Sequence, residues 1–280
     1  MNLLNQKSTH LNLSLEKEGL KKYFMNKLFK KISESKSLLM THVVIGYPSI
    51  AETIKIVEIM AKAGSDIIEL QMPFSDPVAD GPTIMHANDE SLKNGTTTKD
   101  CLKIMGILSK KVNIPLLFMG YYNTIYNYGV EKFCKDSAKA GCQGLIVPDM
   151  PIDEEKYENF YKSAKKNNLA VILVVSPLTN DKRLKVMKKY AQGFIYAMAR
   201  TGITGENTEF KNDFSKYIGR VKKIINLPIA VGFGIKEKSQ VDFAHKYAEI
   251  AVIGSKLIEI YKDTKLNKFA AISKFIKSLQ

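Results

Sequence analysis

The stretch that decides the fold runs from Asp66 to Thr83 and reads DIIELQMPFSDPVADGPT. It begins as a short apolar, β-branched run and breaks at Met72-Pro73 into a compact loop rich in proline. Glu69 lies within the apolar run, and Asp76 and Asp80 lie in the loop. An apolar strand that carries an acid and leads into a rigid acidic loop is typical of the catalytic end of a βα unit.

The same alternation of apolar strand and amphipathic helix continues on both sides of this stretch. Strands are predicted at 38–45, 67–70, 115–119, 144–147, 170–175, 194–198, 228–231 and 250–253. Helices are predicted at 49–63, 83–94, 98–110, 129–140, 153–167, 181–191, 210–224, 237–246 and from Ser255 to the C-terminus, with 120–123 as a loop. Eight strands each followed by helix indicate an α/β protein with a (β/α)8 TIM barrel. A doubly wound sheet is less suitable, because no Gly-x-Gly-x-x-Gly follows the first strand.

The N-terminus is predicted to add one helix to this barrel. Leu28, Phe29 and Ile32 fall on one helical face, which is expected to cap the bottom of the barrel. Residues 1–24 carry no strong pattern and are interpreted as an N-terminal extension, with a disordered tail as one alternative. No linker-like stretch divides residues 25–280, so they are predicted to form a single barrel domain.

The composition favours a soluble cytoplasmic enzyme over a nucleic-acid or membrane protein. The formal charge of +14 comes almost entirely from lysines spread over every predicted helix, whereas nucleic-acid readers rely on arginine. No apolar run approaches the roughly 20 residues of a membrane span, and the N-terminus lacks a signal-peptide core. Cys101, Cys134 and Cys142 are too few and too irregularly spaced for a disulfide framework, so reduced, buried thiols are expected.

Glycine clusters in three consecutive loops predict a phosphate site. They are 202–205 after the sixth strand, 232–234 after the seventh, and Gly254-Ser255 after the eighth. Phosphate sites of barrels are often built from the last of these loops and a helix N-terminus, where backbone N–H groups approach the anion closely. Plain turn chemistry is the alternative for each glycine pair taken alone.

Glu69 and Asp80 are the candidate acid–base groups. A buried glutamate is costly unless it is paired or protonated, and burial brings a carboxyl pKa toward the range useful for proton transfer. The structural alternatives are a hydrogen bond from Glu69 to a neighbouring strand, for example to Tyr196, and an N-cap role for Asp80 at the helix near Thr83. His42 is expected to point into the barrel mouth, but the four histidines lack metal-ligand spacing, so no metal is predicted. Two carboxylates beside a phosphate cradle suggest proton transfer on a phosphorylated substrate.

The motifs together resemble the tryptophan synthase alpha subunit family. The resemblance rests first on the long motif from Pro73 to Thr83, with Glu69 four residues ahead of it. Further motifs follow in order: Gly46-Tyr47-Pro48, Pro148-Asp149-Met150-Pro151, Arg200 to Gly205, Gly232 to Ile235, and Gly254-Ser255. The resemblance covers roughly residues 25–270 and implies retro-aldol cleavage of indole-3-glycerol phosphate to indole and glyceraldehyde 3-phosphate.

The resemblance also implies roles for individual residues. Glu69 would be the general acid and base, and Asp80 would bind the indole N–H. Tyr196 would stand near the glutamate, Thr204 would help close a loop over the substrate, and Phe233 would pack on the indole. The phosphate would rest on the backbone N–H groups of Gly205, Gly234, Gly254 and Ser255.

The same resemblance implies an α2β2 heterotetramer with a beta subunit that carries pyridoxal phosphate, so this chain itself would need no cofactor. The loop from Pro73 to Asp80 would face that partner. Three residues depart from the family's common pattern: Gln71, Tyr47 and Met85. Gln71 is expected to crowd the mouth or to hydrogen-bond Glu69, and its replacement by glycine is expected to leave activity unchanged or higher.

Three other functions stay open at this point. One is a related phosphate-binding barrel lyase, with indole-3-glycerol phosphate synthase the nearest by ligand, although that enzyme typically needs lysines at strand ends. The second is a catalytically weak allosteric regulator of the beta subunit, and the third is a basic nucleic-acid binder.

Overall fold

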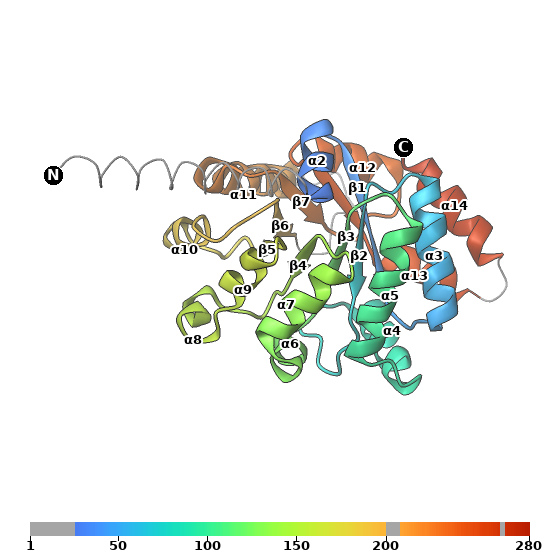
Figure 1. Ribbon diagram of the computed structural model, residues 1–280. Helices are drawn as coiled ribbons and strands as arrows, with labels where there is room; N and C mark the ends of the chain where they lie inside the picture. Colours follow the sequence, from blue (N-terminus) through green and yellow to red (C-terminus); the bar gives the residue numbers. More distant parts are fainter. Residues whose placement is uncertain (1–25, 200–207, 264–266) are drawn as a thin grey trace, which may run out of the picture.

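The strands of the computed structural model, which describes residues 26–199, 208–263 and 267–280, close into one barrel (Figure 1). Every pair of neighbouring strands is parallel, and β8 pairs with β1. The strands are β1 (Leu38–Val44), β2 (Ile67–Gln71), β3 (Leu116–Met119), β4 (Gly144–Ile146), β5 (Ala170–Val175), β6 (Ile195–Met198), β7 (Ile229–Gly232) and β8 (Ile250–Ile253). The predicted (β/α)8 barrel is confirmed.

Helices surround the barrel close to the predicted positions. They are α3 (Ile50–Ala63), α4 (Pro82–Lys93), α5 (Thr98–Lys111), α6 (Tyr122–Tyr128), α7 (Val130–Lys139), α8 (Glu155–Glu158), α9 (Phe160–Lys166), α10 (Asp181–Met187), α11 (Thr208–Ile225), α12 (Lys238–His245), α13 (Ser255–Lys262) and α14 (Lys268–Ser278). A 3-10 helix, η1 (Ile152–Glu154), precedes α8.

Two helix predictions were wrong in detail. The predicted loop at 120–123 runs into α6, whose first turn is held by a distant side chain: the Tyr122 N–H donates to both carboxylate oxygens of Asp149, at 2.8 and 3.0 Å. The helix predicted at 153–167 is instead broken into η1, α8 and α9. The break falls at Asn159, which takes a left-handed conformation with φ of 52°. Asparagine enters that region more readily than most residues.

The barrel interior is set by the two-residue period of the strands. Met40 on β1 and Ile67 on β2 belong to the buried cluster inside the barrel, whereas Leu39 and Ile68 belong to the layer between strands and helices. Side chains alternate along a strand, so the next inward positions carry polar groups, which are described below. Positions toward the carboxyl ends of the strands therefore line the mouth of the barrel.

The N-terminal helix α2 (Lys27–Glu34) closes the opposite end of the barrel. Leu28 is fully buried in the interior cluster, with Phe29 and Ile32 packed against it. The Asn26 amide donates to the backbone carbonyls of Gln143 and Asn168, which precede β4 and β5. In Figure 1 this helix lies at the top of the view, at the other end of the barrel from α4 and α6. The predicted cap on the barrel bottom is confirmed.

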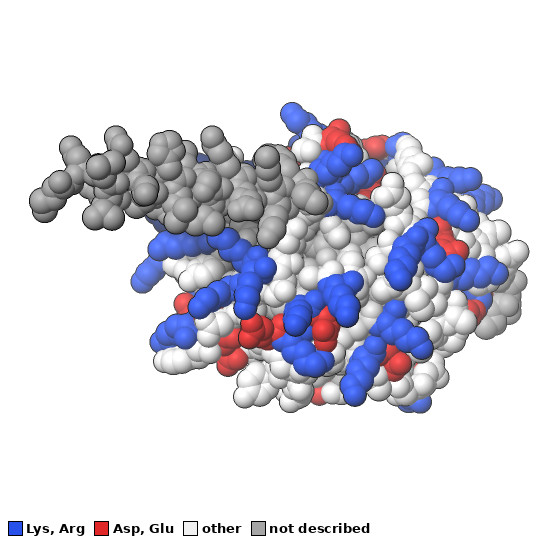
Figure 2. Space-filling view, viewed as in Figure 1, with Lys and Arg blue, Asp and Glu red and all other residues white. Residues whose placement is uncertain are grey.

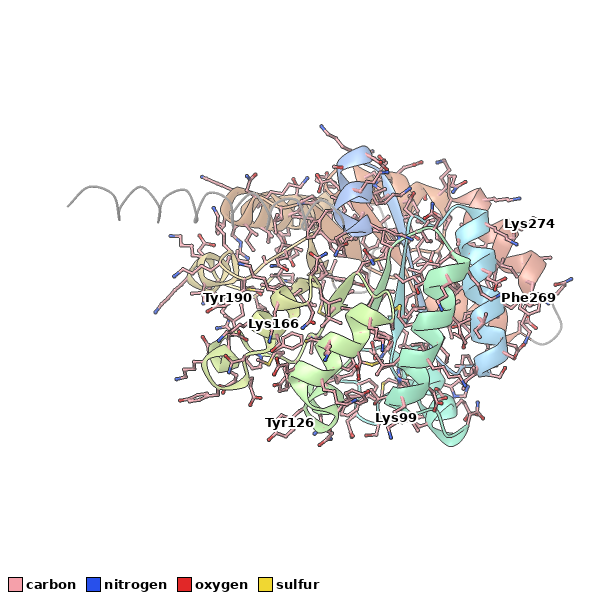
Figure 3. The ribbon with its side chains drawn as sticks, in the orientation of Figure 1. Lys99, Tyr126, Lys166, Tyr190, Phe269 and Lys274 are labelled. Carbon is pink, nitrogen blue, oxygen red and sulfur yellow. The ribbon has the colours of Figure 1, made fainter. Side chains whose placement is uncertain are left out.

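The C-terminal helix α14 packs on α3 and completes the outer ring. Phe269, labelled in Figure 3, lies on α14 beneath the Lys55 ammonium of α3, 4.0 Å from the ring centre. Lys268 forms an ion pair with Glu52 across the same contact.

Another contact of the outer ring is visible in Figure 3, where Tyr190 is labelled. The ring of Tyr190 packs on that of Tyr161 of α9, with 5.2 Å between ring centres. Such contacts bury the apolar faces of helices that flank neighbouring strands.

The molecular surface bears its lysines in a scattered pattern. On the face shown in Figure 2, lysine and arginine side chains are dispersed and acidic groups lie among them. None of the helices in the described part of the chain is long and apolar enough to cross a membrane. All three cysteines are buried and unpaired, which agrees with the expectation of buried thiols.

Candidate active site

A cavity of about 390 Å³ opens at the carboxyl ends of the strands. All eight strands contribute lining residues, and the loop that follows β2 adds more. Seven of the predicted site residues line it: Glu69, Asp80, Tyr196, Phe233, Gly234, Gly254 and Ser255. Thr204 and Gly205, the other two, lie outside the residues that the structure describes.

Glu69 is buried at the inner wall of this cavity and contacts a histidine. Its Oε1 lies 3.2 Å from Nδ1 of His42, and both side chains are about 5% exposed. The contact follows from strand register, because His42 on β1 and Glu69 on β2 are directly paired positions. The sequence pointed to Tyr196 as a possible hydrogen-bond partner of Glu69, whereas the structure places His42 there. The expectation that His42 points into the barrel mouth is confirmed.

The Glu69 carboxylate stabilises the protonated form of the His42 imidazole. Burial alone would lower the pKa of His42, but the charge of Glu69 and its hydrogen bond outweigh burial and raise that pKa. The Asp80 charge and the Gln71 side chain act in the same direction. Nε2 of His42 and Oε2 of Glu69 are buried and have no hydrogen-bond partner among the described residues.

Asp80 is held by two donors from inside the barrel. The Gln71 amide donates to Oδ2 at 2.6 Å, and the Tyr121 hydroxyl donates to the same oxygen at 3.1 Å. Burial raises the pKa of Asp80, while the hydrogen bonds from Gln71 and Tyr121 oppose that shift. Asp80 is not an N-cap, because Gly81 holds that position and Pro82 opens α4. The capping alternative is therefore wrong, and Asp80 faces the cavity.

The three residues that depart from the common family pattern have different surroundings. Gln71 is fully buried and binds Asp80, not Glu69. Tyr47 is also buried, and its ring packs against His86 and Tyr261 away from the cavity lining. Met85 lies on α4 and is 43% exposed. Only the first of them therefore belongs to the candidate site.

Because Gln71 binds Asp80, we now expect its replacement to lower the activity, whereas the sequence led us to expect unchanged or higher activity. Replacing Gln71 with methionine keeps the side-chain length but removes the donor to Asp80, so we expect kcat/KM for indole release to fall about tenfold to a hundredfold at neutral pH, as for a lost hydrogen bond to a charged group. The pKa of Asp80 should rise further, and the acidic limb of the pH profile should move to higher pH. Steady-state kinetics from pH 5.5 to 8.5, with the melting temperature as a check on folding, measures both effects. Unchanged or higher activity would show that the hydrogen bond from Gln71 to Asp80 is not needed for turnover, as the expectation for Gln71→Gly implied.

The part of the cavity formed by β7, β8 and the loops after them is built from glycines and a helix N-terminus. Gly234 has a positive φ of 78°, and a Cβ on Gly232 would lie only 3.0 Å from the Tyr196 hydroxyl oxygen. Gly254 and Ser255 stand at the start of α13. Backbone N–H groups at such a helix start attract anions. Phe233 is 4% exposed and packs edge-on against Phe214 and Phe243, which fixes the loop after β7.

The role of Tyr121 was missed in the sequence, and no contact was assigned to His42. The Tyr121 hydroxyl donates to Asp80 and accepts from the N–H of Ala79. Because Tyr121 follows β3, these two bonds tie the loop after β2 to the neighbouring strand. His42 was recognised only as one of four weak histidine signals. Its position two residues after Met40 was the available clue, because that spacing continues the inward face of β1. Among the described residues, no group of three or more His, Cys, Asp or Glu could hold a metal ion.

Fold and site together define a (β/α)8-barrel enzyme whose cavity is lined by a buried carboxylate, Glu69, a half-buried carboxylate, Asp80, and glycines at the start of a helix. The sequence model of the tryptophan synthase alpha chain family matches residues 28–280. The chain therefore belongs to the tryptophan synthase alpha chain family, the indole-3-glycerol phosphate lyase subunit of tryptophan biosynthesis, which works with a beta subunit. The family resemblance seen in the sequence is confirmed.

Individual relatives agree with this assignment. The tryptophan synthase alpha chain of Desulfotalea psychrophila is 42% identical over 253 residues, covering 90% of this chain and 98% of the relative. That of Petrotoga mobilis is 39% identical over 259 residues, covering 91% and 99%. A crystal structure of tryptophan synthase from M. tuberculosis, in an aminoacrylate-bound form, matches with a TM-score of 0.81 at 26% identity, over 91% of this chain and 98% of that one.

Proposed function

We propose that the chain cleaves indole-3-glycerol phosphate by a retro-aldol reaction, using the residues that line the cavity, and passes indole to a beta subunit. The observation that carries this proposal is the arrangement of the cavity: Glu69 and Asp80 line it from β2 and the loop after β2, and the glycines of β7 and of the loops after β7 and β8 line it as well. A substrate with an aromatic ring at one end and a phosphate at the other fits that polarity.

Glu69 acts as the general acid and base. Its unpartnered Oε2 donates a proton to the indole ring carbon that carries the glycerol chain, which makes the carbon–carbon bond cleavable. The resulting carboxylate then takes the proton of the hydroxyl on the adjacent side-chain carbon as the bond breaks. One proton has moved from oxygen to carbon, so the acid is restored and the products are indole and an aldehyde.

Asp80 balances the positive charge that develops on the ring nitrogen. An ionised carboxylate fixed before the reaction stabilises that charge without reorganising at the moment of protonation. Gln71 and Tyr121 provide this fixation by donating to Oδ2. Their donation also opposes the rise in the pKa of Asp80 that burial causes.

The other site residues bind and enclose the substrate. The phosphate rests on backbone N–H groups of Gly205, Gly234, Gly254 and Ser255, with the start of α13 contributing its positive end. Tyr196 stands beside Glu69, and Phe233 packs on the indole. The role of Thr204 in enclosing the substrate is carried over from the family resemblance, since this residue lies outside the described part of the chain.

The chain works in the cytoplasm as half of an α2β2 heterotetramer. No cofactor is needed by the alpha reaction, and pyridoxal phosphate belongs to the beta subunit. The loop after β2 is suited to face that partner, because Val78 at its centre is 85% exposed although it is apolar. Asp76 in the same loop is exposed and hydrogen-bonded by Ser75.

Purified protein is expected to release indole from indole-3-glycerol phosphate slowly, and much faster when a beta subunit from a close relative is added. The increase is expected because partner contacts on the exposed part of the loop after β2 would exclude water from the cavity beside Asp80. Indole can be measured by its reaction with an aldehyde reagent, and the Glu131→Gln variant, altered at an exposed ion pair, serves as a matched surface control.

The alternative is a catalytically weak regulator of the beta subunit. It would raise beta-subunit turnover with serine and indole yet release no indole itself, with or without the partner. That result would overturn the lyase proposal while leaving the family membership intact.

A further inference from the structure

The buried contact between His42 and Glu69 is the strongest feature of the cavity that the proposed chemistry leaves unused. Nδ1 of His42 lies 3.2 Å from Oε1 of Glu69, so one carboxylate oxygen is engaged by the imidazole. The other oxygen, Oε2, has no partner among the described residues and belongs to a residue of the cavity wall. The two oxygens of the proposed acid therefore have different surroundings.

The groups around His42 come from four elements of the barrel. Glu69 and Gln71 face it from β2, Asp80 from the loop after β2, and Tyr196 stands on β6 across the cavity. On the β8 side the ring lies against Gly254, which has no side chain: a Cβ built there would meet Cβ and Cγ of His42 at 3.5 and 3.7 Å. The described charges near the imidazole are thus two carboxylates, and the balance of these groups favours a proton on the ring.

We propose that His42 and Glu69 hold the catalytic proton jointly, with His42 as a positioning residue that acts through Oε1 of Glu69 while Oε2 exchanges protons with the substrate. This inference rests on the proposed lyase function and adds a residue to it. In one arrangement the imidazole is neutral with its proton on Nδ1, which donates to Oε1, and the carboxylic acid carries its proton on Oε2. In the other arrangement that proton is on Nε2 instead, so the pair is an imidazolium and a carboxylate with the same total number of protons.

The pair would work in the reaction without gaining or losing a proton overall. When Oε2 gives its proton to the ring carbon, the new carboxylate is stabilised by the N–H of His42 at Oε1. When the substrate hydroxyl loses its proton, that proton returns to Oε2. Because two interacting groups titrate as a pair, the proton is retained to higher pH than by a carboxyl group alone.

The activity test compares His42→Asn and His42→Phe in complex with the beta subunit. Asparagine keeps an N–H near the place of Nδ1 but cannot hold a proton, and phenylalanine removes both properties. In both variants the basic limb of the kcat profile should move at least one pH unit lower, so that kcat at pH 8 falls at least about tenfold. His245→Asn, on α12, is the matched control and should behave as wild type. If His42→Asn has the wild-type profile, His42 only orients Glu69 and the proposal is overturned.

A second measurement does not depend on turnover. Ring-nitrogen NMR of the full chain labelled in histidine should show His42 titrating above the ordinary histidine pKa of 6.5, with the resonance assigned by its absence in His42→Asn. In Glu69→Gln the pKa of His42 should fall, since burial remains and the carboxylate in contact with the ring is gone. A pKa of His42 that does not change in Glu69→Gln overturns the pair. If the pair titrates as expected but no indole is released, the failure lies with the proposed function.

Discussion

Replacing Glu69 with glutamine is expected to lower kcat for indole release by at least about a thousandfold, because general acid and base transfers each supply about 10²–10⁴ and this side chain performs both. Glutamine keeps the shape of the side chain and an oxygen for the N–H of His42, so the cavity should keep its form. Indole-3-glycerol phosphate should still bind, because its phosphate would be held by backbone N–H groups that the substitution does not change. Isothermal calorimetry of binding, beside single-turnover kinetics, separates the two properties.

The control for this variant is the same chemical change at an exposed site. Glu131→Gln on α7 breaks a surface ion pair with Lys166, and surface pairs contribute little to stability. Its turnover should match wild type. Substantial turnover in Glu69→Gln, with binding intact, would mean that another group supplies the proton.

Replacing Asp80 with asparagine is expected to lower kcat by about a hundredfold, the usual cost of removing one fixed electrostatic contact to a developing charge. The pH dependence provides the sharper test. The pKa of Asp80 is raised by burial, so the wild-type anion is lost earlier than usual as pH falls. Wild-type activity should therefore decline on the acidic side with a limb that Asp80→Asn lacks. Rate profiles from pH 4.5 to 8 compare the two proteins.

Asp242→Asn on α12 is the corresponding surface control, since Asp242 is exposed and pairs only loosely with Lys238 at 3.3 Å. An acidic limb that persists unchanged in Asp80→Asn would assign that limb to a different group. A loss of binding as large as the loss of kcat would instead give Asp80 a role in ground-state affinity.

Much of the site was predictable because of one topological rule. In a parallel barrel the carboxyl ends of all strands meet at the same face, so Glu69 on β2 and the glycines after β7 and β8 had to share a cavity once the strands were recognised. The strands themselves were recognisable from short apolar runs, and each lies within about one residue of its predicted bounds. No knowledge of long-range contacts was needed for either step.

What could not be predicted depends on contacts between distant segments. The choice of His42 as the neighbour of Glu69 is set by the register of β1 against β2, which no local pattern encodes. The bond from Gln71 to Asp80 needs the loop after β2 to fold back over its own strand, and Tyr121 on the β3 side holds it there. The first turn of α6 likewise depends on Asp149, a residue from the next loop.

The register of β1 against β2 has a consequence for natural variation. The pairing of position 42 with position 69 is fixed by backbone hydrogen bonds, not by the side chains that occupy them. A closed barrel has no free edge along which a strand could slip, so the pairing persists when the residue at position 42 changes. A substitution at position 42 therefore changes a direct contact of Glu69 while the strand pairing stays in place. Differences in optimum pH among such enzymes are best sought at that position, ahead of the acid itself.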